Sequence, residues 1–338
     1  MSYRYCLYGL SLTTEEPLPG LERGRVAGES GEVRLQLNGE PDWVLRARSL
    51  PCCRVHQLDA EPETNDPSFV VTSYGADRFF GLAYSDGTQF ITDGEGRRLW
   101  GAWTEPWTKE DFTTYLLGPA MGFVLRRRGV TPLHASAVCV GGKAVVFCGD
   151  AQTGKSTTAA ALGLRGAPVL CEDIAALKMA DNRYWVEPGY PRVCLWPDSV
   201  EKLLGRSDAL PLLTPNWEKR YLPLDGVLAS FQRERCAVGA VYMLAPRAAE
   251  GNAPCIEEMA RKEALLELVQ NTYMNWLPDR EQQARDFEAM TQLAGQVPVR
   301  RIMAPGDPKH MAATHSMILA DAERLSRSPV AAGQPNPS

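Results

Sequence analysis

The chain has 338 residues, 44% apolar and 8% aromatic, enough for about two domains with hydrophobic cores. Its net charge of −5 argues against a nucleic-acid surface, because polyphosphate backbones select strongly basic faces. The nine cysteines include no Cys-x-x-Cys pair, so we expect neither zinc nor disulfides but thiols, most of them buried, in a reducing compartment. No apolar stretch approaches the roughly 18 residues of a membrane span, which predicts a cytoplasmic protein without membrane association.

Residues 1–130 are predicted to form a β-rich domain that ends in a connecting helix. Short runs of β-branched and aromatic residues, separated by Gly, Pro and Asp turns, indicate strands. These strands are expected at 3–12, 32–37, 43–47, 69–73, 79–84 and 89–92. The acidic stretch at 59–67 is expected to be an exposed loop. Because no catalytic residue types gather here, we interpret this half as a recognition or assembly module.

The connecting helix is expected over residues 108–128. Thr108 and Asp111 have the form of a capping box, with Asp in place of the preferred Glu, and Gly129 provides the stop. Pro119 is expected to kink the helix.

Three arginines at 126–128 lie at the end of this helix. Their charge suits the negative helix terminus, and a phosphate-binding role is the alternative.

From residue 131 the predicted strands alternate with helices, as in α/β folds. Strands are expected at 136–140, 143–148, 168–171, 174–179, 184–187, 192–195, 236–244 and 297–303. Helices are expected at 156–164, 199–204, 262–270, 281–295 and 308–325. The predicted fold class is therefore α+β or α/β, with a second domain at 131–325 and a disordered tail at 326–338.

A phosphate-binding loop is predicted between the strand at 143–148 and the following helix. The run Gly149-Asp150-Ala151-Gln152-Thr153-Gly154-Lys155-Ser156 matches the pattern of Gly, four residues, Gly, Lys and Ser or Thr. Its glycines let backbone N–H groups and the helix N-terminus approach a polyphosphate. Lys155 would reach the β- and γ-phosphates, and Ser156 would hold Mg²⁺. The alternative is a glycine turn before an ordinary helix.

Three ionisable residues accompany this loop. His134 lies 15 residues before Gly149, and Glu172 and Asp173 lie 17 and 18 residues after Lys155, at the end of the next predicted strand. In phosphoryl transfer, one carboxylate holds Mg²⁺ and another accepts the proton of the attacking hydroxyl. Adjacent acids leaving one strand are able to divide these tasks. A structural histidine and a solvated acidic loop are the alternatives.

This constellation resembles the catalytic domain of bacterial HPr kinase/phosphorylase, a serine kinase with a PEP carboxykinase-like phosphate-loop fold. The matching segments are Leu133-His134-Ala135-Ser136, Gly149 through Ser156, Arg165-Gly166 and Glu172-Asp173. The N-terminal half is more similar to HPr-kinase-like proteins that open with Tyr-x-x-x-Gly-Leu, here Tyr5 to Leu10, and carry Pro188-Gly189-Tyr190-Pro191-Arg192. Some members of that group are linked to phosphorylation of lasso-peptide precursors.

The resemblance implies an ATP- and Mg²⁺-dependent kinase that phosphorylates a serine hydroxyl of a peptide or small protein. Asp173 would be the general base, His134 would orient the base or nucleophile, and Glu172 with Ser156 would lie near the metal. The expected nucleotide contacts are Gly149, Asp150, Ala151, Gln152, Thr153, Gly154, Lys155, Ser156, Thr157, Arg192, Lys219 and Arg220. Two departures are Thr157, where the family has an acid, and Glu172, where it has Asp.

The loop alone does not identify the acceptor, so two other functions stay open. One is a small-molecule kinase or nucleotide hydrolase on the same fold, and the other is a nucleotide-responsive binding protein without transfer. Arg192 belongs to a segment that is alternatively a rigid turn with no role in binding. Lys219 and Arg220 are alternatively exposed side chains that do not contact the nucleotide. A homo-oligomer is also compatible with the resemblance.

Overall fold

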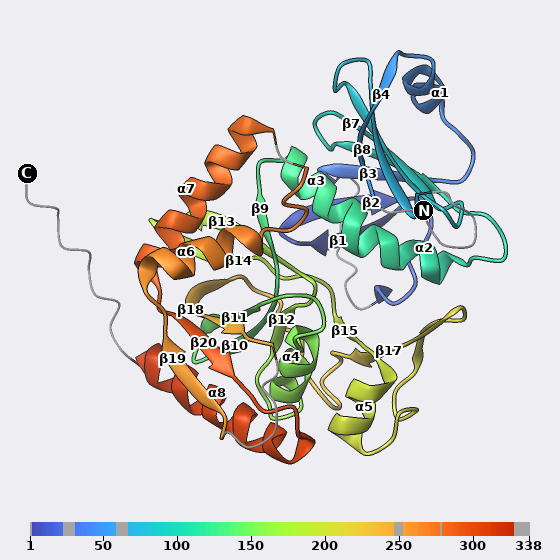
Figure 1. Cartoon of the computed structure of the whole chain (residues 1–338). Helices are drawn as coiled ribbons and strands as arrows, with labels where there is room; N and C mark the ends of the chain where they lie inside the picture. Colours follow the sequence, from blue (N-terminus) through green and yellow to red (C-terminus); the bar gives the residue numbers. More distant parts are fainter. Residues whose placement is uncertain (1, 23–30, 59–66, 247–252, 278, 328–338) are drawn as a thin grey trace, which may run out of the picture.

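The computed structural model describes residues 2–22, 31–58, 67–246, 253–277 and 279–327, and these residues form a mixed α/β fold with three sheets (Figure 1). An eight-stranded sheet occupies one end of the molecule, and a nine-stranded sheet with its helices occupies the other. A long helical segment lies between them (Figure 1).

The eight-stranded sheet is built from the N-terminal part of the chain, in the order β1-β2-β3-β8-β7-β6-β5-β4. Its strands are β1 (Tyr3–Leu7), β2 (Leu10–Thr14), β3 (Val33–Leu37), β4 (Cys52–Gln57), β5 (Phe69–Tyr74), β6 (Phe79–Tyr84), β7 (Gln89–Asp93) and β8 (Arg98–Ala102). Most of the predicted strands are confirmed, and β4 and β8 were not predicted. The loop predicted at 59–67 lies, except for its last residue, outside the described residues.

The strand predicted at 43–47 is wrong, because these residues belong to the helix α1 (Asp42–Arg48). Val44 and Ala47, three residues apart, are buried together against Trp100. This spacing places both side chains on one face of a helix, and their packing outweighs the strand preference of the neighbouring aromatic and β-branched residues.

The connecting helix consists of α2 (Lys109–Tyr115), a π-helical turn η2 (Leu116–Ala120) that contains Pro119, and α3 (Met121–Arg127). The capping box is confirmed, since Thr108 N–H donates to Asp111 Oδ2 at 2.8 Å and the Thr108 side chain accepts from Asp111 N–H. The three arginines at the end of this helix make structural contacts. Arg126 pairs with Asp286, Arg127 donates to the Gly94 carbonyl and Arg128 pairs with Glu32.

The nine-stranded sheet contains β9 to β14 and β18 to β20. Their bounds are β9 (Thr131–His134), β10 (Ser136–Val140), β11 (Lys143–Cys148), β12 (Val169–Cys171), β13 (Ile174–Ala180), β14 (Arg183–Val186), β18 (Cys236–Leu244), β19 (Cys255–Glu258) and β20 (Val299–Met303). The central β18 runs parallel to both β11 and β20. The carboxyl ends of these three strands therefore meet at one edge of the sheet.

Helices cover both faces of this sheet. One hydrophobic core joins it to α4 (Lys155–Gly163) and α8 (Met311–Arg327), and another joins it to α6 (Arg261–Gln270) and α7 (Arg280–Gln296). A short 3₁₀ turn, η3 (Pro308–His310), precedes α8. Because α8 ends at Arg327, the first two residues of the predicted tail are helical, and the rest lies outside the described residues.

A three-stranded sheet, ordered β15-β17-β16, adjoins the core that contains α4 and α8. Its strands are β15 (Arg192–Leu195), β16 (Leu212–Thr214) and β17 (Trp217–Pro223), and α5 (Pro197–Leu204) follows β15. Of these strands only β15 was predicted.

The two halves of the chain share a hydrophobic core. The segment predicted as one strand at 3–12 is a hairpin, whose turn residue Tyr8 has a left-handed φ of 57°. Tyr8 N–H donates to the Pro188 carbonyl at 2.7 Å, its hydroxyl donates to the Leu117 carbonyl at 2.7 Å, and its ring meets the Tyr190 ring edge-on. The N-terminal hairpin therefore contacts the second half of the chain directly. The domain boundary at residue 130 stays a prediction.

All nine cysteines are unpaired, but only three of them, Cys148, Cys171 and Cys236, are buried. The expectation that most thiols would be buried is wrong. Among the helices that the structure describes, none combines the length and apolar character needed to cross a membrane.

Candidate functional site

The predicted loop connects β11 to α4 in the expected strand, loop and helix order. Gly149 and Gly154 have φ values of +138° and +103°, which favour glycine. A Cβ on Gly149 would lie 2.6 Å from the Leu244 carbonyl oxygen. No side chain caps the N-terminus of α4, where the first N–H groups of a helix lack intrahelical acceptors. The loop therefore presents backbone donors and the positive end of a helix dipole.

Lys155 closes over this loop. Its Nζ donates to the Gly149 carbonyl at 2.8 Å and to the Asp150 carbonyl at 3.0 Å. Burial lowers the pKa of Lys155 below its usual value, although the nearby Cys148 and Asp173 act in the opposite direction. Its cation is therefore held at the loop rather than in open solvent.

Asn271 fixes the start of the loop from another part of the chain. Gly149 N–H donates to Asn271 Oδ1 at 2.9 Å, and Asn271 Nδ2 donates to the Glu267 carbonyl of α6. The sequence held no local signal for this contact, since 122 positions separate its partners.

Glu172 and Asp173 occupy a tight turn between β12 and β13. Ile174 N–H donates to the Glu172 carbonyl at 2.7 Å, and Asp173 has a left-handed φ of 64°. A three-residue turn of this kind is rare and strained for a residue other than glycine. The turn gives the two neighbouring carboxylates different partners.

Glu172 points to the phosphate loop. Its Oε1 accepts from Ser156 Oγ at 2.9 Å, and its Oε2 accepts from the Tyr190 hydroxyl at 2.7 Å. Burial, followed by the charge of Asp173, raises the pKa of Glu172, and the bonds from Tyr190 and Ser156 only partly oppose this shift.

Asp173 instead meets His134 and Tyr273. Cross-strand pairing of His134 with Ile174 brings His134 Nε2 to 3.4 Å from Asp173 Oδ1, and the Tyr273 hydroxyl donates to Oδ2 at 3.2 Å. Burial raises the pKa of Asp173, but the hydrogen bond and charge of His134, the bond from Tyr273 and the charge of Lys219 together leave it lowered. The environments thus push the pKa values of the two acids apart, which is typical of catalytic pairs.

The oxygen donors of Ser156 and Glu172 suit Mg²⁺, which in nucleotide sites takes one or two protein ligands together with phosphate oxygens. Among the described residues, no group of three or more His, Cys, Asp or Glu side chains is arranged to hold a metal.

The loop and the acid pair face one open cleft with a volume of about 1460 Å³. Its lining includes His134, Glu172, Asp173 and Lys219, and the loop residues Ala151, Gln152, Gly154, Lys155, Ser156 and Thr157. Asp198 and Ser199 of α5 also line it, and neither was predicted as a site residue. Lys219 Nζ lies 4.9 Å from the centre of the Trp196 ring, and both residues line this cleft.

Two of the predicted basic contacts lie elsewhere. Arg192 is only 4% exposed, and its guanidinium lies 5.6 Å and 5.9 Å from the ring centres of Tyr190 and Tyr221. Arg220 donates to the Leu210 carbonyl at 2.7 Å. Neither belongs to the lining of the cleft, so the structure does not bring Arg192 and Arg220 to the other predicted residues.

A second cavity of about 940 Å³ shares His134 and Ala151 with the cleft. Gly149 and Asp150 of the loop also line it. Its other walls carry aromatic and apolar side chains from both halves of the chain, including Leu58, Phe69, Tyr84, Pro119, Met274 and Trp276. The His134 and Asp173 pair therefore lies where the polar cleft meets an aromatic cavity.

Comparison with known proteins gives little direct guidance. No family model matches the chain, and no curated protein matches it. Among solved structures, it is similar to the Hpr(Ser) kinase/phosphatase from Coxiella burnetii, with 15% identity and a TM-score of 0.31, over 57% of this chain and 96% of that chain.

Proposed function

We propose that this protein is an ATP- and Mg²⁺-dependent kinase that transfers the γ-phosphoryl group to a serine hydroxyl of a peptide or small protein. The observation that carries the proposal is that the loop at 149–156 shares one cleft with Asp173 and His134, while Ser156 is hydrogen-bonded to Glu172. Donor-binding groups and a candidate base thus face the same space.

The donor half of the site consists of the loop, α4 and Lys155. Backbone N–H groups at the start of α4 bind the phosphate oxygens, and Lys155 moves from the carbonyls of Gly149 and Asp150 to the β- and γ-phosphates. Ser156 and Glu172 would hold Mg²⁺, which would supply positive charge against the phosphates.

The transfer half consists of Asp173 with its two hydrogen-bonding neighbours. The serine oxygen forms a bond to the γ-phosphorus, the bond from that phosphorus to the β,γ-bridging oxygen breaks, and ADP leaves. The hydroxyl proton goes to Asp173, whose lowered pKa keeps the carboxylate ionised at neutral pH. His134 and Tyr273 hold this carboxylate in place.

The aromatic cavity beside His134 supports a peptide acceptor. Because it adjoins the cleft at His134 and Ala151, a serine side chain is able to approach the γ-phosphate from this side while the nucleotide occupies the cleft. The rings of Phe69, Tyr84 and Trp276 suit an apolar residue next to the serine.

The test is incubation of the purified protein with γ-labelled ATP, Mg²⁺ and a panel of serine-containing precursor peptides and small carrier proteins. We expect label on the serine of an acceptor, and none when that serine is replaced by Ala. Asp173→Asn should lower transfer by about 10²- to 10⁴-fold, the usual contribution of a general base. Lys155→Ala should lower both ATP binding and transfer.

Asp181→Asn is the matched control. Asp181 is an exposed residue in the turn after β13, with a left-handed φ of 51° close to that of Asp173. It should leave transfer unchanged. The proposal is wrong if Lys155→Ala and Asp173→Asn also leave transfer unchanged, and phosphate release that keeps pace with turnover in the absence of any acceptor would identify a hydrolase instead.

A further inference from the structure

The strand β4 forms one edge of the eight-stranded sheet. Of the strands that the structure describes, β5 alone pairs with it. Five of its six residues are exposed, and only His56 is partly buried. Val55 of β4 and Leu58, which follows it, are apolar and yet 43% and 47% exposed. An edge strand with this exposure is a template for pairing with another extended chain.

The backbone of β4 turns hydrogen-bonding groups outward along this edge. Leu58 N–H donates to the Phe69 carbonyl at 3.0 Å, and the neighbouring pair in the register is Gln57 with Val70. In an antiparallel ladder, pairs of residues that exchange hydrogen bonds alternate with pairs that do not. The N–H and carbonyl of Gln57 therefore point away from β5.

The other end of β4 has the same arrangement. Gly75 N–H donates to the Pro51 carbonyl at 2.8 Å, so the next residue, Cys52, turns its backbone groups outward, and so does Arg54 two positions further on. A bulge at Val55 separates this part of the strand from Gln57. Three residues of β4 thus present both a donor and an acceptor to an incoming strand.

β4 leads directly into the aromatic cavity beside His134. Leu58 and its hydrogen-bonding partner Phe69 both line this cavity. His56 lies two positions before Leu58, on the same face of the sheet, and stacks on Trp276 of the cavity wall with ring centres 3.5 Å apart. The lining of the cavity extends from there to His134. A chain paired with β4 is therefore continuous with the path by which the acceptor serine approaches the cleft.

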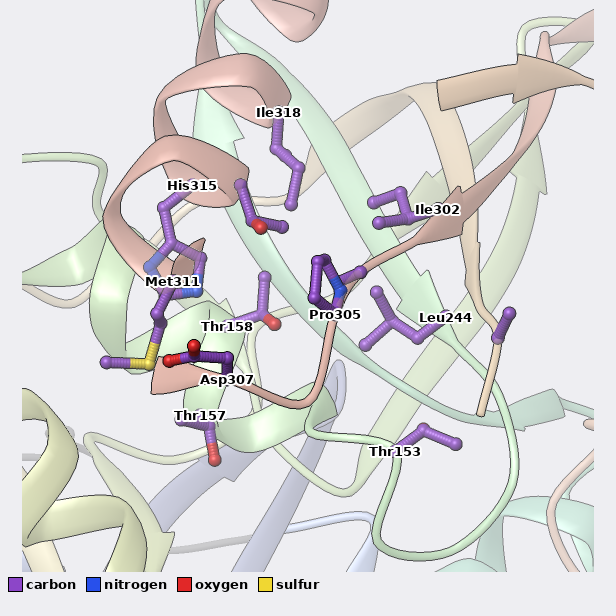
Figure 2. Close-up of a pocket in the computed structure, with 13 residues that line it drawn as sticks. Thr153, Thr157, Thr158, Leu244, Ile302, Pro305, Asp307, Met311, His315 and Ile318 are labelled. Atoms are coloured by element: carbon purple, nitrogen blue, oxygen red, sulfur yellow. The ribbon is translucent and has the colours of Figure 1, made fainter. Parts of the chain in front are cut away.

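A separate cavity beside the phosphate loop has no such strand edge. It has a volume of about 550 Å³, and Leu244, Ile302 and Pro305 contribute to its walls at the ends of β18 and β20 (Figure 2). β18 pairs with both β11 and β20, and β20 pairs with both β18 and β19. Of these two cavities, the aromatic one alone adjoins a strand edge that is open to an extended peptide.

We infer that β4 is the docking strand for the acceptor: an extended segment next to the acceptor serine adds to the sheet along β4 and continues into the aromatic cavity. In this mode of recognition, main-chain hydrogen bonds supply affinity and side-chain pockets supply specificity. The continuity of β4 with the cavity selects the acceptor peptide as the occupant of the edge. The inference rests on the proposed function, because it takes the substrate to be a peptide whose serine passes His134.

The test uses the peptide that the transfer assay labels, at full length and in a shortened form that keeps the serine and its immediate neighbours. Gln57→Pro removes the outward N–H, and edge strands tolerate proline at such a position. It should raise the KM for the full-length peptide by about tenfold, the order expected for one lost hydrogen bond. The KM for the shortened peptide and the Kd of ATP should not change. Gln57→Ala is the matched control, because it removes the side chain and keeps the N–H, and it should leave all three values unchanged.

Amide hydrogen exchange on the wild type provides a second measurement that does not depend on the folding of a variant. The full-length peptide should slow exchange at Cys52, Arg54 and Gln57, and the shortened peptide should not. If the full-length peptide leaves exchange at these amides unchanged, or if Gln57→Pro has the wild-type KM for it, the docking assignment is overturned while the kinase activity stands. If the wild type labels no peptide, the proposed function fails and the docking assignment fails with it.

Discussion

Ser156 and Glu172 share a hydrogen bond of 2.9 Å across 16 positions of the chain, and this bond ties the start of α4 to the acid pair. Glu172 is held from its other side by Tyr190. The loop and the acids therefore have a fixed relative position before any ligand contact is considered.

Tyr190→Phe should weaken Mg²⁺ binding. The change removes the hydroxyl that donates to Glu172 Oε2 at 2.7 Å, and groups that orient a metal ligand typically contribute about 10- to 100-fold to metal affinity. The measurement is the Mg²⁺ concentration that gives half-maximal transfer. Tyr8→Phe is the control, since the Tyr8 hydroxyl is also buried but donates to the Leu117 carbonyl. An unchanged Mg²⁺ requirement in Tyr190→Phe would contradict the assigned role of Glu172.

Gly149→Ala should abolish triphosphate binding and destabilise the fold, because the added Cβ would lie 2.6 Å from the Leu244 carbonyl oxygen. Gly142→Ala separates this collision from the cost of a left-handed residue, since Gly142 has a φ of +77° but open space around its Cβ position. We expect Gly142→Ala to cost about 1–2 kcal/mol in urea unfolding and to retain binding. If Gly149→Ala and Gly142→Ala lose equal amounts of unfolding free energy and of triphosphate binding, the contact with the Leu244 carbonyl is unimportant.

Arg126→Met should destabilise the protein by about 3–5 kcal/mol, because it leaves the buried carboxylate of Asp286 without its cation. The two side chains are 2.7 Å apart and only 2% and 10% exposed, and they join α3 to α7. Urea unfolding measures the loss. The double variant Arg126→Met with Asp286→Leu should recover most of it, and a double variant less stable than the single one would contradict this account.

The ionised carboxylate of Asp321 should make the free energy of unfolding depend on pH. Burial raises its pKa, but hydrogen bonds from Tyr242 and Arg324 and the charge of Arg300 leave it lowered. A lowered folded-state pKa gives stability that is present above the unfolded value of about 3.9 and is lost as the pH falls through the folded value. Asp321→Asn should therefore reduce the free energy of unfolding at pH 7, and its difference from the wild type should shrink below about pH 4.

The control for this pH dependence is Asp208→Asn. Asp208 is also paired with an arginine, Arg206, but both side chains are more than half exposed, so solvent screens their interaction. The change should leave the unfolding free energy almost unaltered at every pH. If the difference in free energy of unfolding between the wild type and Asp321→Asn persists unchanged in acid, the charge of the carboxylate is not the stabilising feature.

Local signals in the sequence were sufficient to predict the loop at 149–156 and the elements on either side of it. Alternating or continuous apolar runs gave β11 and β18 their bounds, and the glycines with Lys155 and Ser156 marked the loop between β11 and α4. These features depend on residues close together in the chain, where spacing and turn chemistry act directly.

The partners of the acids could not be predicted in this way. Tyr273 reaches Asp173 from 100 positions away, and Asn271 reaches Gly149 from 122. Arg192 was expected at the phosphates because of its chemistry, but two tyrosine rings hold it outside the cleft. Such contacts depend on how distant elements pack, which no local pattern encodes.

The hairpin turn at Tyr8 has an evolutionary consequence. The Tyr8 ring meets the ring of Tyr190, and Tyr190 holds Glu172, so loss of the aromatic ring at position 8 alters the support of a group 164 positions away, whereas loss of the Tyr8 hydroxyl alone does not. Related chains should therefore show covariation between positions 8 and 190. A natural exchange of the N-terminal sheet by recombination near residue 130 should succeed only when both positions come from the same parent.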